Sequence, residues 1–312
     1  MTKISIIDYS AWKPYEGITE GSGRSEKLWL QSEDGSIGLF KFPKNSPVAK
    51  TTTYEHISEH LACQIGKVLN VNTANVKIGT YCNRIGSMSY RVNRPDEALI
   101  EGAWFILGKH RHYDIETMRD SETGKYYSLE YFSEISQSMS GTEVIHLFWI
   151  EMMLFDFLIG NSDRHQNNWA FISPIVDKNK NVIRIRPCPL YDNGSSLCCY
   201  VRDAELKDYL GKDRNRFNAL VNTKSKSLIR INGNDKRRPL HTEVVKHLLQ
   251  TYPVTKEIAD RFIQALDEKA VIQLLDVYPN DLLGDSRKIL MRNYLLAKIE
   301  LLKTIRGEAD NG

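Results

Sequence analysis

The chain has 312 residues, and at roughly 150 residues per domain this length predicts two domains or one large protein with two lobes. Hydrophobic residues make up 41% of the chain and charged residues 26%, proportions that exclude disordered, collagen-like and coiled-coil proteins. The formal net charge of +3 is too small to indicate nucleic acid or an acidic membrane surface as a partner.

The sequence also bears on where the protein works. Its longest apolar stretch, Leu147 to Gly160, contains two carboxylates and is too short to span a bilayer. The first residues lack the apolar core and the cleavage site of a secretory signal. The five cysteines form no CxxC pair and leave an odd number, which argues against a zinc site or a disulfide framework. We therefore expect a cytoplasmic protein, with export without a cleaved signal peptide as the alternative.

The first hundred residues show the patterns of short strands around one helix. Strands are predicted at Lys3–Tyr9, Lys27–Gln31, Ile37–Phe42, Asn75–Tyr81 and Ile85–Asn93, with a turn at Cys82–Arg84 joining the last two. The helix is predicted within Thr51–Val71, where Ile57, Leu61, Ile65 and Val68 recur at helical spacing. We expect residues 1–102 to form a small mixed lobe.

Beyond residue 102 the pattern becomes mainly helical. After a hinge expected near Glu101–Gly108, a strongly apolar helix is predicted at Gly141–Ile159. Two short strands follow, at Trp169–Ile172 and Ile183–Pro187, and helical patterns then run from His241 to Ile305. We expect residues 103–312 to form a larger helical lobe, so the predicted fold is α+β with two lobes.

The strongest chemical signal lies in two polar motifs of this second region. Phosphoryl transfer from ATP needs a carboxylate that orients the attacking hydroxyl, and amide and carboxylate oxygens that hold magnesium. In the loop Gly160–Asn168, Asp163 followed by Asn168 reproduces the Asp-to-Asn step of a kinase catalytic loop. Asp192, in Tyr-Asp-Asn-Gly, lies where a kinase has its metal-binding Asp-x-Gly. Each motif alone is also typical of a turn or cap, but both in this order predict transfer from Mg-ATP.

The first lobe contains three further candidates in the order that such an enzyme requires. A loop with Gly17, Gly21 and Gly23 allows backbone amides to approach phosphates, although a plain surface loop is the alternative. Lys41 lies on a predicted strand whose alternation directs its ammonium to one face, and Lys44 is a nearby competitor. Two helical glutamates, Glu55 and Glu59, lie one turn apart, and spacing alone lets either pair with Lys41.

Three segments, Ser58–Val71, Gly160–Asn168 and Pro189–Leu197, resemble the HipA-like serine/threonine kinases, in particular their compact, cell-translocating type. The resemblance implies a protein-kinase-like fold and ATP- and magnesium-dependent phosphorylation of serine or threonine, commonly with autophosphorylation. It implies that Asp163 is the catalytic carboxylate and that Asn168 and Asp192 are the metal ligands. It also implies that Lys41 contacts the phosphates and pairs with Glu59 rather than Glu55.

Further expectations concern the nucleotide and the partners. ATP is expected to contact the glycine loop, Lys41 and the hinge, that is Gly17, Gly21, Ser22, Gly23, Lys41 and Glu101. Autophosphorylation is expected in the same loop, at Ser22 first and then at Thr19 or Ser25. The expected partners are a protein substrate with a serine or threonine acceptor and, as in a toxin module, an antitoxin-like protein. Neither direct nucleic acid binding nor membrane binding is expected.

Other functions and other clusters stay open. The motif Asp-Arg-His-x-x-Asn is also similar to that of phosphoinositide kinases, so a lipid or small-molecule acceptor is one alternative. A nucleotide-binding regulatory module with weak catalysis is another. The segment Lys224–Arg238 has six basic residues and one acid, and either binds an acidic substrate or nucleic acid or is a solvated loop. His110 and His112 are interpreted as surface histidines rather than metal ligands.

Overall fold

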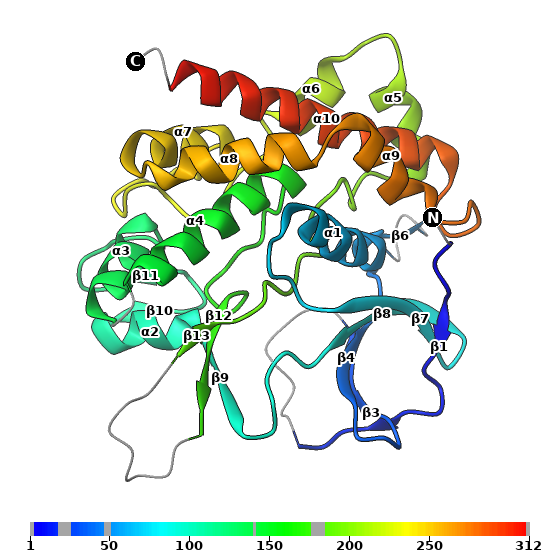
Figure 1. The fold of residues 1–312 in the computed structure, drawn as a ribbon, viewed down its shortest axis with the longest axis horizontal. Coiled ribbons are helices and arrows are strands. Elements are labelled where there is room, and N and C mark those ends of the chain that lie inside the picture. Colours follow the sequence, from blue (N-terminus) through cyan, green and yellow to red (C-terminus); the bar gives the residue numbers. More distant parts are fainter. Residues whose placement is uncertain (1–2, 18–25, 47–50, 140–141, 176–184, 310–312) are drawn as a thin grey trace. The chain divides into compact units, whose positions relative to one another are not determined.

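The computed structural model describes residues 3–17, 26–46, 51–139, 142–175 and 185–309. The chain divides into two compact units, each assembled from three separate segments (Figure 1). Unit 1 consists of Met1–Val92, Tyr191–Asn218 and Ala265–Leu296, and unit 2 of Asn93–Leu190, Ala219–Gln264 and Ala297–Gly312. The sequence analysis predicts two contiguous lobes, residues 1–102 and 103–312. This division of the chain remains a prediction.

Unit 1 is built on a six-stranded sheet whose strands follow the order β1-β7-β8-β4-β3-β2. The strands are β1 (Ile7–Asp8), β2 (Lys13–Pro14), β3 (Lys27–Gln31), β4 (Ile37–Lys41), β7 (Val76–Tyr81) and β8 (Arg84–Tyr90). Only β1 and β7 run parallel; the other neighbours are antiparallel. The predicted hairpin of β7 and β8 is confirmed, and its two-residue loop places Cys82 and Asn83 at φ of 48° and 61°, as tight hairpin turns require.

Two sequence predictions in unit 1 are corrected by the structure. The strand expected over Lys3–Tyr9 is reduced to β1, because the backbone N–H of Ile4 donates to the carbonyl of Val277 instead of to a neighbouring strand. The helix expected from Thr51 begins later, because Thr51–Thr52 forms the short strand β6 and pairs with β5 (Asn45–Ser46). The first correction arises from a long-range hydrogen bond, which local periodicity does not contain, and the second from a local strand pairing.

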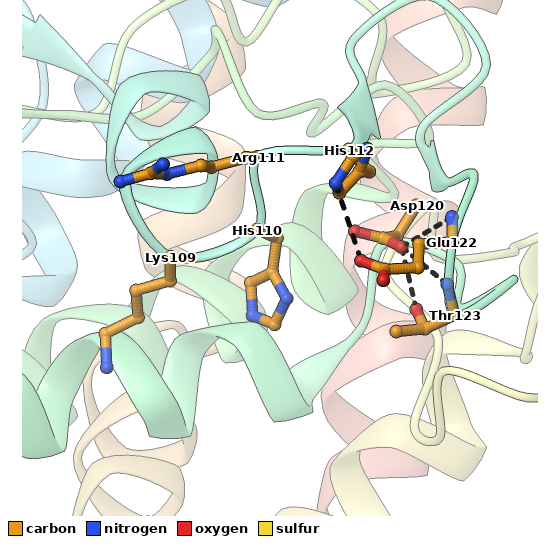
Figure 2. A pocket seen from close by; sticks show the side chains of 7 residues that line it. All are labelled: Lys109, His110, Arg111, His112, Asp120, Glu122 and Thr123. Carbon is orange, nitrogen blue, oxygen red and sulfur yellow. Dashed lines mark hydrogen bonds and ion pairs between the residues drawn. The ribbon is translucent and has the colours of Figure 1, made fainter.

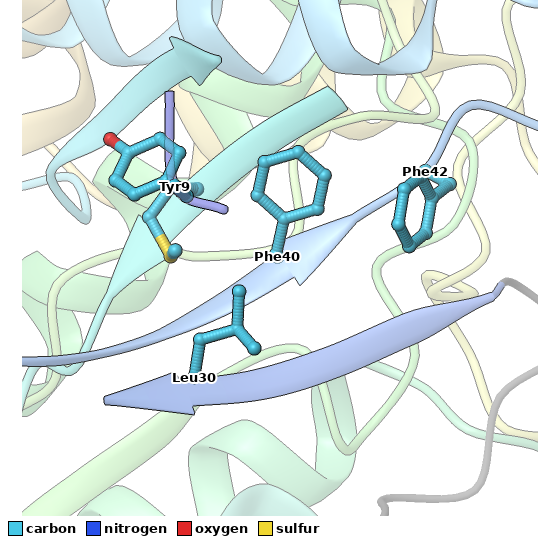
Figure 3. Close-up of a cluster of buried hydrophobic side chains, with 5 residues drawn as sticks. Tyr9, Leu30, Phe40 and Phe42 are labelled. Carbon is cyan, nitrogen blue, oxygen red and sulfur yellow. The ribbon is translucent and has the colours of Figure 1, made fainter. Parts of the chain in front are cut away.

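One face of the sheet is covered by an apolar cluster of Tyr9, Leu30, Phe40, Phe42 and Met88 (Figure 3). Phe40 and Phe42 lie on either side of Lys41 in the sequence, and their ring centroids are 5.0 Å apart. Because successive side chains of a strand point to opposite faces, burying both rings in this cluster directs Lys41 to the other face. The packing of the sheet thus determines where the lysine points.

Helix α1 (Glu55–Leu69) packs on strands β7 and β8 of this sheet. It ends where Asn70 adopts a left-handed conformation with φ of 55° and its N–H bonds to the carbonyls of Gly66 and Lys67. Most of the helix is buried, on the carboxylate-bearing side as well as on the apolar one, whereas Val68 of the expected apolar stripe is exposed. Glu59 is therefore held at a buried position. The other helices that lie wholly in unit 1 are the short 3-10 helix η1 (Asp203–Glu205), α5 (Leu206–Leu210) and α9 (Glu268–Asp276).

Unit 2 has a three-stranded sheet in the order β13-β12-β9, from Arg186–Pro187, Ala170–Pro174 and Glu97–Glu101. Its helices include α2 (Gly102–Lys109), α3 (Leu129–Ser138), α4 (Thr142–Ile159) and α7 (His241–Thr251), and it has a small hairpin of β10 (Tyr113–Asp114) and β11 (Arg119–Asp120). Residues of both units belong to α6 (Asn215–Val221), α8 (Val254–Ala265) and α10 (Asp285–Glu308). The segment expected as a hinge, Glu101–Gly108, is the end of β9 and most of α2.

Within the described ranges, we find no helix with both the length and the apolar character needed to cross a bilayer.

Candidate active site

Three charged residues of unit 1 meet at the lysine of strand β4. The Nζ atom of Lys41 lies 2.9 Å from Oε1 of Glu59 and 2.9 Å from Oδ1 of Asp192. The Glu59 side chain is 3% exposed, and its Oε2 atom accepts a hydrogen bond of 3.4 Å from the hydroxyl of Ser87 on β8. The structure thus brings together three of the predicted site residues. They come from a strand, a helix and a motif in which Asp192 follows Lys41 by 151 positions.

The electrostatics of this cluster keep its lysine charged. Burial alone lowers the pKa of Lys41, but the carboxylates of Asp192 and Glu59 outweigh burial and raise that pKa above its usual value. Burial raises the pKa of Glu59, and the ammonium of Lys41 opposes this rise. Because the ammonium stays protonated, it offers a fixed positive charge to an anion such as a phosphate.

The competing residues form a separate ion pair. The Nζ atom of Lys44 lies 2.8 Å from Oε1 of Glu55, whose carboxylate also accepts hydrogen bonds from the hydroxyls of Thr53 and Tyr200. The Lys44 side chain is 42% exposed, against 16% for Lys41. Spacing alone left four pairings open, and the structure contains Lys41–Glu59 and Lys44–Glu55.

The Asp-Asn-Gly motif has an unusual backbone and packs on the start of α1. Asp192 has a φ of 56°, a left-handed conformation that few residues other than glycine adopt and that occurs often at functional sites. A Cβ atom at Gly194 would lie 3.3 Å from the backbone oxygen of Glu55, so a larger residue would push the motif away from the helix. Asn193 is buried, and its carbonyl accepts a 2.6 Å hydrogen bond from the hydroxyl of Ser196. These features fix the direction of the Asp192 side chain.

The segment that follows the motif is held by Arg287, a residue that the sequence analysis missed. Its Nη2 atom donates to the carbonyl of Val201 and to Oδ1 of Asp203, both at 2.6 Å, and Nη1 donates to the carbonyl of Cys198 at 3.3 Å. The guanidinium also lies over the ring of Tyr54, 3.9 Å from its centroid. No local pattern predicts this, because Arg287 follows the motif by more than 80 residues.

In unit 2, hydrogen bonds between its own residues shape the predicted catalytic loop. The side chain of Asp163 is exposed, while its N–H donates to Oδ1 of Asn161 at 3.0 Å. The Nδ2 atom of Asn168 donates to the carbonyl of Asp163 at 2.8 Å, so one edge of the buried asparagine amide is used in shaping the loop. His165 accepts a hydrogen bond from the N–H of Asn167 through Nδ1, which is a structural contact of the same loop.

A buried ion pair supports this loop. Arg164 donates through Nε and Nη2 to both oxygens of Asp156 on α4, at 2.9 and 2.7 Å, and through Nη1 to the carbonyl of Asn168 at 2.7 Å. Both side chains are at most 5% exposed. The sequence signal was available, since Asp156 is a carboxylate inside a strongly apolar helix and Arg164 follows eight residues later.

The remaining predicted residues are placed as follows. Glu101 is the last residue of β9 and pairs with Ala170. Gly17 lies in a turn, and the other expected nucleotide and autophosphorylation residues, Thr19, Gly21, Ser22, Gly23 and Ser25, lie outside the described residues.

The His110 and His112 cluster lines a polar pocket of about 240 Å³ in unit 2, together with Lys109, Arg111, Asp120, Glu122 and Thr123 (Figure 2). The Oδ1 atom of Asp120 accepts hydrogen bonds from the N–H groups of Glu122 and Thr123, and His112 lies 3.5 Å from Glu122. The pocket residues are thus largely engaged with one another.

The resemblance found in the sequence implies magnesium, and the donors of the predicted ligands suit it. Asn168 and Asp192 present an amide and a carboxylate oxygen, the hard donors that magnesium prefers. Nowhere in the described ranges do three or more His, Cys, Asp or Glu residues lie together in a way that holds a metal ion. Magnesium commonly uses only one or two protein ligands and completes its coordination with phosphates and water, so the donor chemistry of each residue suits the metal.

Comparison with known proteins shows the family to which the chain belongs. The family model described as "HipA-like C-terminal domain" matches residues 19–269, and the chain belongs to this family. Among curated proteins it is similar to the serine/threonine-protein kinase CtkA of Helicobacter pylori (strain J99), with 23% identity over 289 residues, which are 85% of this chain and 84% of that protein.

Solved structures agree with this assignment at the level of the fold. The crystal structure of the Helicobacter pylori proinflammatory kinase CtkA matches with a TM-score of 0.78 and 20% identity, covering 97% of this chain and 99% of that one. HipA of Shewanella oneidensis MR-1, solved with HipB and operator DNA, matches with a TM-score of 0.59 and 13% identity, covering 98% and 69%. The predicted α+β, protein-kinase-like fold is confirmed.

Proposed function

We propose that the protein is an ATP- and magnesium-dependent serine/threonine protein kinase. The observation that carries the proposal is the buried cluster of Lys41, Glu59 and Asp192 in a chain of the HipA-like family. A lysine held by a helical glutamate next to the carboxylate of an Asp-x-Gly motif is the arrangement that protein kinases use to bind the phosphates of ATP.

Each predicted residue has a distinct task in this reaction. Lys41 and the glycine loop position the phosphates, and Glu59 fixes the lysine. Asp163 orients the acceptor hydroxyl and accepts its proton, and Asn168 and Asp192 hold magnesium. Magnesium neutralises the charge that develops on the transferred phosphoryl group. Most of the acceleration would come from this fixed arrangement of charges. Autophosphorylation and a role in a toxin module with an antitoxin-like partner extend the proposal by similarity to the relatives.

The test replaces Asp163 and Asp192 separately by asparagine and measures transfer of radiolabelled phosphate from ATP. The wild-type protein is incubated with a mixed protein extract and, separately, with phosphoinositide vesicles. Asp163→Asn should lower transfer at least about 100-fold, because a positioned carboxylate contributes that much to proton transfer. It should still bind Mg-ATP, whereas Asp192→Asn should weaken the nucleotide-dependent rise in melting temperature.

A matched control is Asp281→Asn, an exposed carboxylate of unit 1 outside the predicted site, which should leave transfer unchanged. Phosphate incorporated into the vesicles but not into protein would instead identify a lipid kinase. Binding of Mg-ATP without transfer to any acceptor would identify a regulatory nucleotide-binding module. Full transfer by folded Asp163→Asn would remove Asp163 from the mechanism.

A further inference from the structure

A basic segment of unit 2, residues 224–238, is attached to the loop that contains Asp163. The attachment is Arg238, whose Nη2 atom donates to the carbonyls of Ser162 at 2.6 Å and Lys226 at 3.1 Å. Its Nε atom donates to the carbonyl of Ser227 at 3.1 Å. Ser162 directly precedes Asp163, and the same nitrogen contacts Ser162 and Lys226. The backbone of Lys226 is therefore a near neighbour of the Asp163 loop.

The first residues of the basic segment are held by backbone hydrogen bonds. Lys226 forms an antiparallel bridge with Leu240, and the N–H of Ser227 and the N–H of His241 bond to the carbonyls of Pro239 and Ser225. Ser225 and Ser227 are buried, whereas Lys224 and Lys226 are exposed. This alternation places both lysines on the solvent side of the segment.

The two lysines are available to a ligand. Neither forms an ion pair within the ranges that the structure describes, whereas Arg237 is engaged by Glu243 at 2.7 Å. The charge of Asp163 reaches this region: burial and Arg230 lower the pKa of Arg238, and the carboxylate of Asp163 opposes that effect. An acidic peptide approaching Asp163 is repelled by its carboxylate, and nearby ammonium groups offset this repulsion.

We propose that Lys224 and Lys226 form a docking surface for acidic protein segments, so that the preferred acceptors are serines or threonines flanked by aspartate or glutamate. This inference rests on the proposed kinase activity and names its substrate class. Protein is favoured over nucleic acid because the chain has a net charge of only +3.

The experiment uses two fluorescent peptides that carry one central serine, flanked by glutamates in one and by glutamines in the other. Binding is measured by anisotropy and phosphate transfer by initial rates. An exposed ion pair contributes about 0.2–1 kcal/mol, so two pairs should give the glutamate peptide an advantage of about 2- to 30-fold in Kd and KM. High salt should reduce this advantage. The double variant Lys224→Glu/Lys226→Glu should abolish it with an unchanged melting temperature.

Lys269→Glu is the matched control, an exposed lysine on α9 of unit 1 without an ion pair in the described part of the chain, and it should retain the preference. Equal binding of the two peptides, or a preference that survives in the double variant, would overturn the inference. The inference would also be overturned if the protein bound a single-stranded oligonucleotide, the double variant did not bind it, and the two peptides bound equally well. Transfer to both peptides without preference would contradict the docking surface alone. Preferential binding without transfer to any acceptor would support the docking surface and contradict the kinase activity.

Discussion

The ammonium of Lys41 lies 2.9 Å from the carboxylate of Glu59, on the turn of α1 that follows Glu55. Glu55 pairs at 2.8 Å with Lys44, a more exposed lysine. Helix α1 thus supplies the glutamates of two lysine–glutamate pairs. The second pair is an internal control for the first.

The first prediction is a mutant cycle on these two pairs. Lys41→Ala and Glu59→Ala should each lower phosphate transfer roughly 100-fold, as removal of a fixed charge from an active site commonly does. The double variant should be little worse than either single one, because contacting residues couple. Lys44→Ala, at a 42% exposed side chain, should change the free energy of unfolding by less than about 1 kcal/mol. Lys44→Ala and Glu55→Ala should both change transfer only slightly. Additive losses at Lys41 and Glu59, or a larger loss at Glu55, would reassign the pair.

The second prediction concerns the buried pair of Asp156 and Arg164. Arg164→Leu leaves the Asp156 carboxylate buried without its partner, which should cost about 3–5 kcal/mol of unfolding free energy. Asp156→Leu combined with Arg164→Met should cost much less than this, because no charge stays buried. Urea unfolding measures both values.

The control for this pair is Arg216→Leu, whose partner is Asp208 and whose side chain is 55% exposed; it should cost less than about 1 kcal/mol. A loss that small in Arg164→Leu would show that the pair does not hold the loop.

The third prediction is a loss of stability in acid. Burial lowers the pKa of His56 and of His60 to about 4, and His60 is also bonded to the hydroxyl of Tyr278 at 2.7 Å. Below the unfolded value of about 6.5, the unfolded chain binds protons that the folded chain does not. Stability should therefore be intact above pH 6.5 and fall as the pH decreases towards 4, by up to about 3 kcal/mol for each histidine.

His60→Gln should make unfolding less dependent on pH between 6.5 and 4, and His112→Gln, at an exposed histidine, should not. Denaturant midpoints measured across this pH range provide the comparison. The same pH dependence in wild type and His60→Gln would assign the acid sensitivity to other groups.

The fourth prediction is self-modification of the glycine loop at Ser22, Thr19 or Ser25. A phosphate there adds a charge of about −1.5 to −2 beside the nucleotide and should weaken ATP binding by repulsion. Mass spectrometry after incubation with Mg-ATP should locate the phosphate, and Asp163→Asn should show none. If the protein transfers phosphate to an added substrate but carries none at its own three loop residues, self-modification of the loop is excluded.

Local patterns predicted those parts of the structure that local forces control. Strand β3 has the bounds Lys27–Gln31 that alternation predicts, and the hairpin turn at Cys82 and Asn83 follows from the short spacing between two strands. The pairing of Lys41 with Glu59 was one of several that helical spacing allowed. Burial of Phe40 and Phe42 orients Lys41 and thus explains part of its pairing with Glu59.

Contacts between distant segments were not predictable in this way. Arg238 reaches the loop of Asp163 from 76 residues away, and Ile4 bonds to Val277. Nothing in the neighbourhood of these residues indicates a partner, because arginine and backbone groups find hydrogen bonds in many environments. Asp156 is the exception, since a carboxylate in an apolar helix demands a buried cation.

The anchor formed by Arg287 also has a consequence for protein synthesis. Tyr54, the segment Cys198–Asp203 and Arg287 come from the beginning, the middle and the end of the chain, yet all belong to unit 1. A nascent chain on the ribosome therefore contains Lys41 and Glu59 long before the residue that ties down the segment after Asp192 has been made. Unit 1 can complete this part of its structure only after Arg287 has been translated, and a polypeptide interrupted before that residue would carry the lysine and its glutamate without the anchor.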